Sequence, residues 1–162
     1  MRVKSRFSAQ VASAKEEAQK TARTQMAKTI IARCERKGLR MTGQRRVIAQ
    51  VLQDSDDHPD VEELYARASA MDAGISIATV YRTVKLFEEA GILERLEFGD
   101  GRARYEDAER EHHDHLIDMN TGEVIEFCDP EIEELQERIA RKLGYELRGH
   151  KLELYGVPRK AD

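Results

Sequence analysis

The chain has 162 residues, enough for one compact domain or two small ones, and its net charge is −4. Apolar residues make up 40% and charged residues 36%, as in a soluble globular protein. No apolar run approaches the roughly 18 residues of a membrane span, so we expect no membrane role. The two distant cysteines, Cys34 and Cys128, indicate reduced thiols in a cytoplasm.

The charge is unevenly distributed along the chain. Residues 1–46 hold 13 Lys and Arg against 3 acidic residues, which leaves 14 basic and 28 acidic residues for the rest. A basic N-terminal segment followed by an acidic remainder is compatible with a DNA-binding surface and equally with a solvated basic tail. The first 25 residues lack the apolar run of a secretory signal, and we expect residues 1–25 to form a flexible extension.

The first half predicts three short helices and a hairpin. Boundary signals mark each helix: Gly38 after the segment 28–37, Thr42 as a helix N-cap, Asp60 and Glu63 as a capping box, and Ser76 and Gly91 around the third helix. The strand-like run 92–98, the turn 99–101 and the run 102–106 then predict a hairpin. This order of elements is typical of a winged helix-turn-helix.

The third predicted helix is the candidate DNA-reading element. Its apolar stripe consists of Ile77, Val80, Val84 and Phe87. Thr79 and Arg82 lie on the opposite face with Tyr81 on the flank. Arginine can bond guanine or phosphate, and tyrosine can pack on a thymine methyl in the major groove. A plain helical bundle with a surface arginine is the alternative, and the hairpin favours DNA binding.

The second half contains a dense cluster of potential metal ligands at residues 111–118. Three of the five histidines of the chain fall within four positions, at His112, His113 and His115. In a strand, side chains alternate between faces, so His113 and His115 share one face while His112 and Asp114 share the other. One strand therefore offers ligands to two separate sites, although a solvated surface cluster is the simpler alternative.

Further potential ligands are spread along the chain, at His58, Glu106, Glu126, Glu133 and His150. Imidazole and carboxylate ligands without thiolate suit first-row divalent ions such as Fe²⁺, Mn²⁺, Co²⁺ or Zn²⁺, and they do not select among them. Taken singly, each of these residues is more often a solvated surface group. The histidine cluster is what makes them candidates.

The remaining pattern predicts a small α/β unit. Residues 112–127 form two strands joined by a turn at 120–122, a helix follows at 130–143, and a last strand covers 150–155. A unit of this size is weakly stable alone, so we expect two copies to pair through an extended sheet. Whether the resting state is a dimer or a tetramer is left open.

The sequence resembles the ferric uptake regulator family over residues 30–158. The resemblance rests on Gly-Leu-Arg-Met-Thr (38–42), Ile-Ala-Thr-Val-Tyr-Arg-Thr-Val (77–84), His-His-Asp-His-Leu-Ile (112–117), Val-Ile-Glu-Phe (124–127) and His-Lys-Leu-Glu-Leu-Tyr-Gly (150–156). It implies an α+β protein: a winged helix-turn-helix DNA-binding domain over 26–107 and a small α/β dimerisation domain over 108–162.

The resemblance also implies two metal sites. A regulatory site near the domain hinge maps to His58, Glu106, His113, His115 and Glu126, and a second site maps to His112, Asp114, Glu133 and His150. Tyr81 and Arg82 match the family's DNA-contacting pair, and Arg40 matches the basic position that reaches an A·T-rich minor groove. Many members carry a Cys-x-x-Cys pair where this chain has Asp118 and Thr121, so we expect no structural cysteine-bound zinc.

The implied function is a metal-dependent repressor of iron-uptake genes, with Fe²⁺ as co-repressor and an A·T-rich inverted-repeat operator in double-stranded DNA. The main alternative is a manganese-responsive repressor of the same family, and Zn²⁺, Mn²⁺ or Co²⁺ are expected to bind in vitro. From other classes, a metal-dependent hydrolase needs an open coordination position and a substrate cleft, and a haem sensor needs an axial ligand. Neither requirement is met by a recognisable motif.

Overall fold

The structure is a computed structural model that describes residue 21 and residues 25–159. Its elements follow in the order α2 (Ile30–Arg36), α3 (Gly43–Gln53), α4 (Val61–Met71), α5 (Ile77–Glu89), β1 (Leu93–Glu97), β2 (Ala103–Asp107), β3 (Asp114–Asp118), β4 (Val124–Phe127), α6 (Pro130–Lys142) and β5 (Glu153–Gly156). The extension expected for residues 1–25 lies, apart from residues 21 and 25, outside the described residues.

Contacts divide the chain into two units. The first comprises residues 1–94 with 105–108, and the second comprises 95–104 with 109–162. The hairpin of β1 and β2 is therefore shared between them, because its base belongs to the first unit and its tip to the second.

Helices α3, α4 and α5 begin where the local capping signals predict, and α2 begins at Ile30 inside the expected segment 28–37. Thr29, Thr42 and Ser76 accept hydrogen bonds from backbone N–H groups in the first turns of α2, α3 and α5. At α4, the Asp60 carboxylate accepts from the Glu63 N–H while the Glu63 side chain accepts from the Asp60 N–H, which confirms the predicted capping box. These bonds satisfy amide groups that have no partner within the helix.

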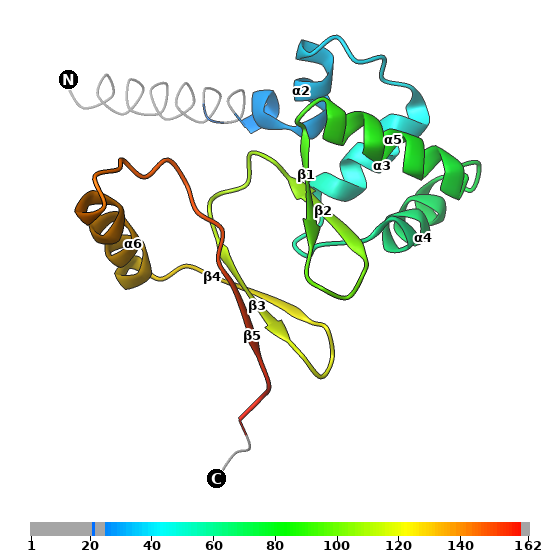
Figure 1. The fold of residues 1–162 in the computed structure, drawn as a ribbon. Helices are drawn as coiled ribbons and strands as arrows, with labels where there is room; N and C mark the ends of the chain where they lie inside the picture. The colour runs from blue at the N-terminus through cyan, green and yellow to red at the C-terminus, as the bar shows by residue number, and fades with distance from the viewer. Residues whose placement is uncertain (1–20, 22–24, 160–162) are drawn as a thin grey trace, which may run out of the picture. The chain divides into compact units, whose positions relative to one another are not determined.

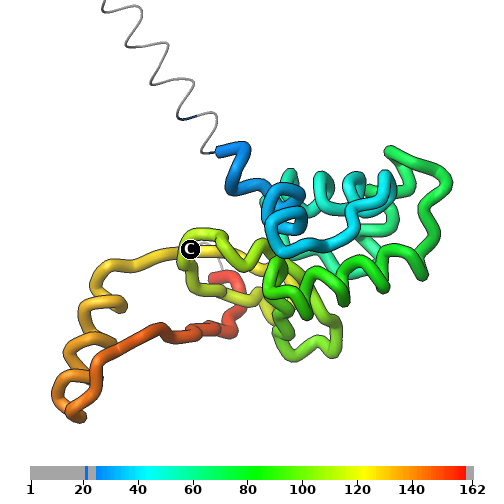
Figure 2. Tube along the Cα trace, turned by 90° about the horizontal axis from the view of Figure 1, so that it is seen from above, coloured from blue at the N-terminus to red at the C-terminus, as the bar shows by residue number. Residues whose placement is uncertain are grey.

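The core of the first unit forms where the apolar faces of α3, α4 and α5 meet (Figures 1 and 2). Its fully buried members include Ile48, Leu64, Val80 and Phe87. Ile77, which we expected in the α5 stripe, is 40% exposed because it lies in the first turn of the helix, whereas Thr83 is 1% exposed. Together with the two-stranded hairpin that follows α5, these helices form a winged helix-turn-helix, as predicted.

The second unit contains a three-stranded sheet in the order β4-β3-β5 (Figure 1). Strand β4 pairs antiparallel with β3, with Glu126 opposite His115. Strand β5 pairs parallel with β3, with Glu153 opposite the same His115. Because β3 is the central strand, its side chains have neighbours from both edge strands.

The predicted last strand begins later than expected. We expected a strand over 150–155, but β5 begins at Glu153, so His150 lies before it. The contact with β3 continues one residue before β5, since the His115 N–H donates to the Leu152 carbonyl at 3.2 Å, whereas residues 150 and 151 precede the start of β3 in the same register. Extending the parallel register three residues back still brings His150 opposite His112.

The turn between β3 and β4 is held by the side chains of Asp118 and Thr121, the two positions at which we expected no cysteine-bound zinc. The Asp118 carboxylate accepts from the Asn120 N–H at 2.8 Å, and the Thr121 hydroxyl accepts from the Glu123 N–H at 3.2 Å. Gly122 adopts a left-handed conformation, with φ 74°. Local hydrogen bonds therefore shape this turn.

Helix α6 starts at the Asp129 N-cap with Pro130 in its first turn, as predicted, and no residue in it is buried. It stands away from the sheet of its unit in both views (Figures 1 and 2). Leu135, Ile139 and Leu143 leave an apolar stripe exposed along its length. None of the helices in the described residues has the length and apolar character needed to cross a membrane.

Candidate metal centre

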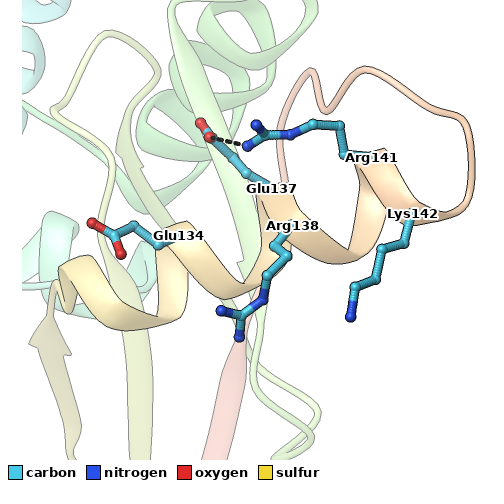
Figure 3. A pocket seen from close by; sticks show the side chains of 5 residues that line it. All are labelled: Glu134, Glu137, Arg138, Arg141 and Lys142. Carbon is cyan, nitrogen blue, oxygen red and sulfur yellow. Dashed lines mark ion pairs between the residues drawn. The ribbon is translucent and has the colours of Figure 1, made fainter.

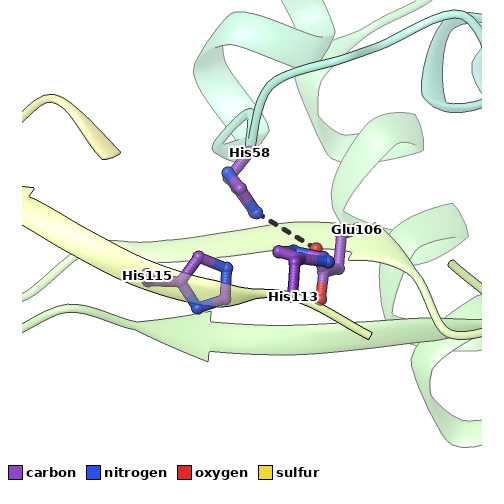
Figure 4. A group of neighbouring side chains, drawn as sticks. All are labelled: His58, Glu106, His113 and His115. Atoms are coloured by element: carbon purple, nitrogen blue, oxygen red, sulfur yellow. Dashed lines mark ion pairs between the residues drawn. The ribbon is translucent and has the colours of Figure 1, made fainter. Parts of the chain in front are cut away.

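In the first unit, the fold brings His58 and Glu106 together from segments far apart in sequence. Nε2 of His58 lies 3.0 Å from Oε2 of Glu106, and these side chains are 2% and 8% exposed (Figure 4). The two segments are joined because the Tyr105 N–H donates to the Pro59 carbonyl at 3.0 Å. This backbone bond places one imidazole and one carboxylate beside each other.

The loop that leads to His58 is anchored by a residue that sequence reasoning missed. Arg67 on α4 donates two hydrogen bonds to the Asp57 carboxylate, at 2.8 and 2.6 Å, and a third to the Ser55 hydroxyl at 3.1 Å. The bond from Arg67 holds the pKa of the Asp57 carboxyl below its usual value. Arg67 therefore restrains the residue next to His58.

In the second unit, His113, His115 and Glu126 lie on one face of the sheet. The rings of His113 and His115 are 4.8 Å apart, and Figure 4 shows both imidazoles projecting from the same strand segment. Nε2 of His113 lies 3.7 Å from Oε1 of Glu126. Nδ1 of His113 lies 2.8 Å from the Glu111 carbonyl, which can only accept, so Nδ1 donates in this contact and Nε2 is the ring nitrogen on the side of Glu126.

The buried His115 ring is supported by the tip of the hairpin. Phe98 packs edge-on against it, with ring centroids 4.9 Å apart, and forms a small apolar cluster with Leu96 and Ile117. Arg104 lies over the Phe98 ring and donates to the Gly122 carbonyl at 3.3 Å. Nothing in the local sequence around Phe98 signals this contact, because it joins segments that are distant in the chain.

The second predicted set converges completely within the second unit. Nε2 of His150 lies 3.0 Å from Nε2 of His112 and 3.0 Å from Oδ1 of Asp114. Oε1 of Glu133 lies 3.4 Å from Nε2 of His112 and 3.5 Å from Nε2 of His150. The alternation of side chains along residues 112–115 is therefore as expected, and each pair meets different partners.

This second cluster fits a divalent metal ion. Ligand atoms around a tetrahedral ion with bonds of about 2.0–2.1 Å lie about 3.3 Å apart, and the separations in this cluster are 3.0–3.7 Å. In addition, Oδ2 of Asp114 and Oε1 of Glu133 are buried without a hydrogen-bond partner among the described residues. Two imidazoles that face each other beside buried carboxylate oxygens are the environment that a cation or shared protons would balance.

The residues predicted to contact DNA lie on the first unit. Tyr81 is 55% exposed and Arg82 is exposed on α5, while the Thr79 hydroxyl is 3.0 Å from the Ser76 hydroxyl and accepts from Arg82 at 3.4 Å. Arg40 is exposed in the segment between α2 and α3, and its carbonyl accepts from Arg45 at 2.6 Å. Thr79 thus belongs to the capping network of α5 as well as to its exposed face.

A surface hollow on α6 offers no comparable site. Its lining comes from one charged face of that helix: Glu134, Glu137, Arg138, Arg141 and Lys142 (Figure 3). Arg141 pairs with Glu137 at 3.6 Å, one turn away along the helix. Such pairs of exposed charges are typical of a solvated helix face and do not indicate a ligand site.

A winged helix on a chain with clustered imidazole and carboxylate donors defines a metal-responsive transcription regulator. Residues 36–155 match the model of the ferric uptake regulator family. The chain is 65% identical over 139 residues to the ferric uptake regulation protein of Rhizobium leguminosarum bv. viciae, across 86% of this chain and 98% of that protein. The chain therefore belongs to the ferric uptake regulator family, whose members are transcription regulators and not enzymes.

Solved structures agree with the family and the fold. A zinc-bound manganese uptake regulator is 65% identical, with a TM-score of 0.72, over 82% of this chain and 100% of that one. The ferric uptake regulator of Vibrio cholerae, described with rearranged DNA-binding domains, is 40% identical, with a TM-score of 0.70, over 77% of this chain and 96% of that one. The α+β class is thus confirmed, and the hydrolase alternative is set aside.

Proposed function

We propose that this chain is a metal-dependent repressor that binds operator DNA through residues 26–107 and dimerises and binds metal through residues 108–162. The observation that carries the proposal is the ligand arrangement on either side of β3. His113 and His115 face Glu126, while His112 and Asp114 face Glu133 and His150. A core does not need such a concentration of ionisable ligands.

The regulatory ion is proposed to bind His58, Glu106, His113, His115 and Glu126. The first unit contributes one imidazole and one carboxylate, and the second unit contributes two imidazoles and one carboxylate. Two imidazoles and one carboxylate are already a set that first-row ions take from protein, and the donors of the first unit would complete the coordination of the ion. An ion bound by both sets would fix the angle between the units and thereby the spacing of the two α5 helices in a dimer.

Metal and DNA are then linked through one conformational equilibrium. A metal that binds the DNA-competent arrangement better than other arrangements must strengthen DNA binding. By linkage, DNA strengthens metal binding by the same factor, and the coupling free energy is typically about 1–3 kcal/mol. The operator is proposed to be A·T-rich and roughly palindromic, because a two-fold dimer reads two half-sites and Arg40 would enter a narrow minor groove.

Dimerisation is proposed to occur through the second unit. Leu154 and Tyr155 on the edge strand β5 are 41% and 51% exposed, and the α6 stripe of Leu135 and Ile139 is 43% and 48% exposed. An open strand edge and an uncovered apolar helix face are both costly in water. Pairing two copies of the chain would cover them.

The second site is proposed to bind its own ion independently of DNA. We expect metal-loaded wild-type protein to hold two ions per chain and His150→Ala to hold one, because His150 contacts the other members of its cluster at 3.0–3.5 Å. Elemental analysis of desalted protein after loading with Zn²⁺ would measure the stoichiometry. Two ions retained in His150→Ala would contradict the assignment, and Arg148→Ala provides a control two residues away.

The identity of the co-repressor has two candidates. The name of the ferric uptake regulation protein, which is 65% identical, supports Fe²⁺. The name of the manganese uptake regulator, which is also 65% identical, supports Mn²⁺. The ligand set does not decide, because imidazole and carboxylate bind both ions. The control of iron-uptake genes is the first proposal and the control of manganese uptake is the second.

The proposed function is tested by DNA binding at controlled free metal. Purified protein would be titrated anaerobically with Fe²⁺ or Mn²⁺ in the presence of a labelled A·T-rich inverted repeat, with scrambled DNA of equal composition as control. Binding that increases with metal and is reversed by chelator is expected. The ion that activates at the lower free concentration indicates the signal, whereas binding that ignores metal would refute the proposal.

A further inference from the structure

Arg110 forms an ion pair with one of the proposed regulatory ligands. Its Nη2 lies 3.0 Å from Oε2 of Glu126, and the side chains of the two residues are 27% and 28% exposed. The other oxygen of the same carboxylate, Oε1, lies 3.7 Å from Nε2 of His113. One oxygen of the Glu126 carboxylate therefore pairs with a permanent cation, and the other lies near a proposed metal ligand.

We infer that Arg110 competes electrostatically with the regulatory metal ion and so sets the free-metal concentration at which the protein responds. This inference rests on the proposed function, because it concerns the same site. A metal ion bound by Glu126 would share the carboxylate with a guanidinium that stays charged at any physiological pH. Two cations on one carboxylate repel each other, and the guanidinium also lowers the electron density that the carboxylate can donate.

The surroundings of Arg110 make this repulsion effective. Both members of the pair are about three-quarters buried, so water screens them less than it screens the exposed pair of Arg148 and Glu146, whose side chains are 83% and 75% exposed. The competition acts on charge and not on ligand type. It therefore shifts the affinities for all divalent ions by a similar factor and tunes the response threshold rather than the selectivity.

A positioning role for Arg110 would have the opposite effect. If its hydrogen bond held Glu126 in a geometry that binds metal, removing it would weaken metal binding, as loss of an outer partner commonly does. It would also affect ions unequally, since ions differ in their geometric demands. The sign of the affinity change and its dependence on the ion therefore separate the two roles.

The test measures metal affinity of the full-length chain without DNA. In a His150→Ala background, which removes the second site, Kd values for Mn²⁺ and Zn²⁺ would be measured by competition with a fluorescent chelator. Arg110→Gln is expected to lower both Kd values about tenfold, which is the scale of effect that outer partners have on metal sites. Arg110→Lys, which keeps the charge, and Arg148→Gln, which removes an equally long but exposed ion pair, are expected to match the background protein.

The variants Arg110→Gln and His113→Ala separate the competition by Arg110 from the existence of the regulatory site. Kd values that stay unchanged or rise in Arg110→Gln, while His113→Ala loses the ion, would overturn the competition and leave the proposed site intact. An unchanged metal affinity in His113→Ala would refute the regulatory site itself. Thermal unfolding of each metal-free variant verifies that it is folded, and Arg110→Met, which also removes the charge, replaces Arg110→Gln if that variant unfolds.

Discussion

Replacing His115 with alanine is expected to abolish metal-dependent DNA binding while the chain still folds. His115 is 5% exposed, lies at the centre of the three-stranded sheet and faces His113 on the proposed regulatory face. Loss of a direct ligand should raise the metal concentration needed for operator binding by more than about 100-fold, since loss of outer partners alone costs about 10–100-fold. Titration of a labelled operator with metal measures the shift.

The fold of this variant needs its own check, because His115 packs against Phe98 with ring centroids 4.9 Å apart. We expect circular dichroism to show native helix content and the unfolding temperature to fall by only several degrees, since truncation of a buried side chain costs about 1–3 kcal/mol. His115→Gln retains more of the volume and is expected to show the same functional loss. A His115→Ala protein that still requires metal at wild-type concentrations would show that the site assignment is wrong.

Replacing Arg82 with alanine is expected to weaken operator binding about 10–100-fold at saturating metal. Arg82 is exposed on α5, and its Nη2 donates to the Thr79 hydroxyl at 3.4 Å, so the guanidinium keeps donors available for a base edge or a phosphate. A good contact of this kind contributes about 1–3 kcal/mol. Fluorescence anisotropy with operator and with scrambled DNA measures both affinity and specificity.

Arg82→Ala separates DNA binding from metal binding. The metal affinity of the free protein is expected to match wild type, because the proposed ligands are all elsewhere in the chain. Arg141→Ala provides the matched control, since Arg141 is an exposed helical arginine of the second unit that pairs with Glu137. Wild-type operator affinity in Arg82→Ala would show that α5 is not the DNA-reading helix, and a loss limited to operator DNA would indicate a base contact rather than a phosphate contact.

Local chemistry made much of this molecule predictable. Helix starts depend on side chains within one turn of the backbone groups that they cap, so Thr42, Asp60 and Ser76 marked them correctly. The alternation of a strand likewise placed His113 with His115 and His112 with Asp114. Family motifs extended these pairs to ligands that no local rule could have joined.

Contacts between distant segments were decided only by the tertiary structure. The extent of β5 depends on its pairing with β3, and the exposure of Ile77 depends on what packs beside the first turn of α5. The support of His115 by Phe98 and the ion pair of Arg110 with Glu126 join residues 17 and 16 positions apart. The periodicity of the sequence carries no information on such pairs. Packing and electrostatic interactions act through space, and the distance between these side chains is fixed only when the chain folds.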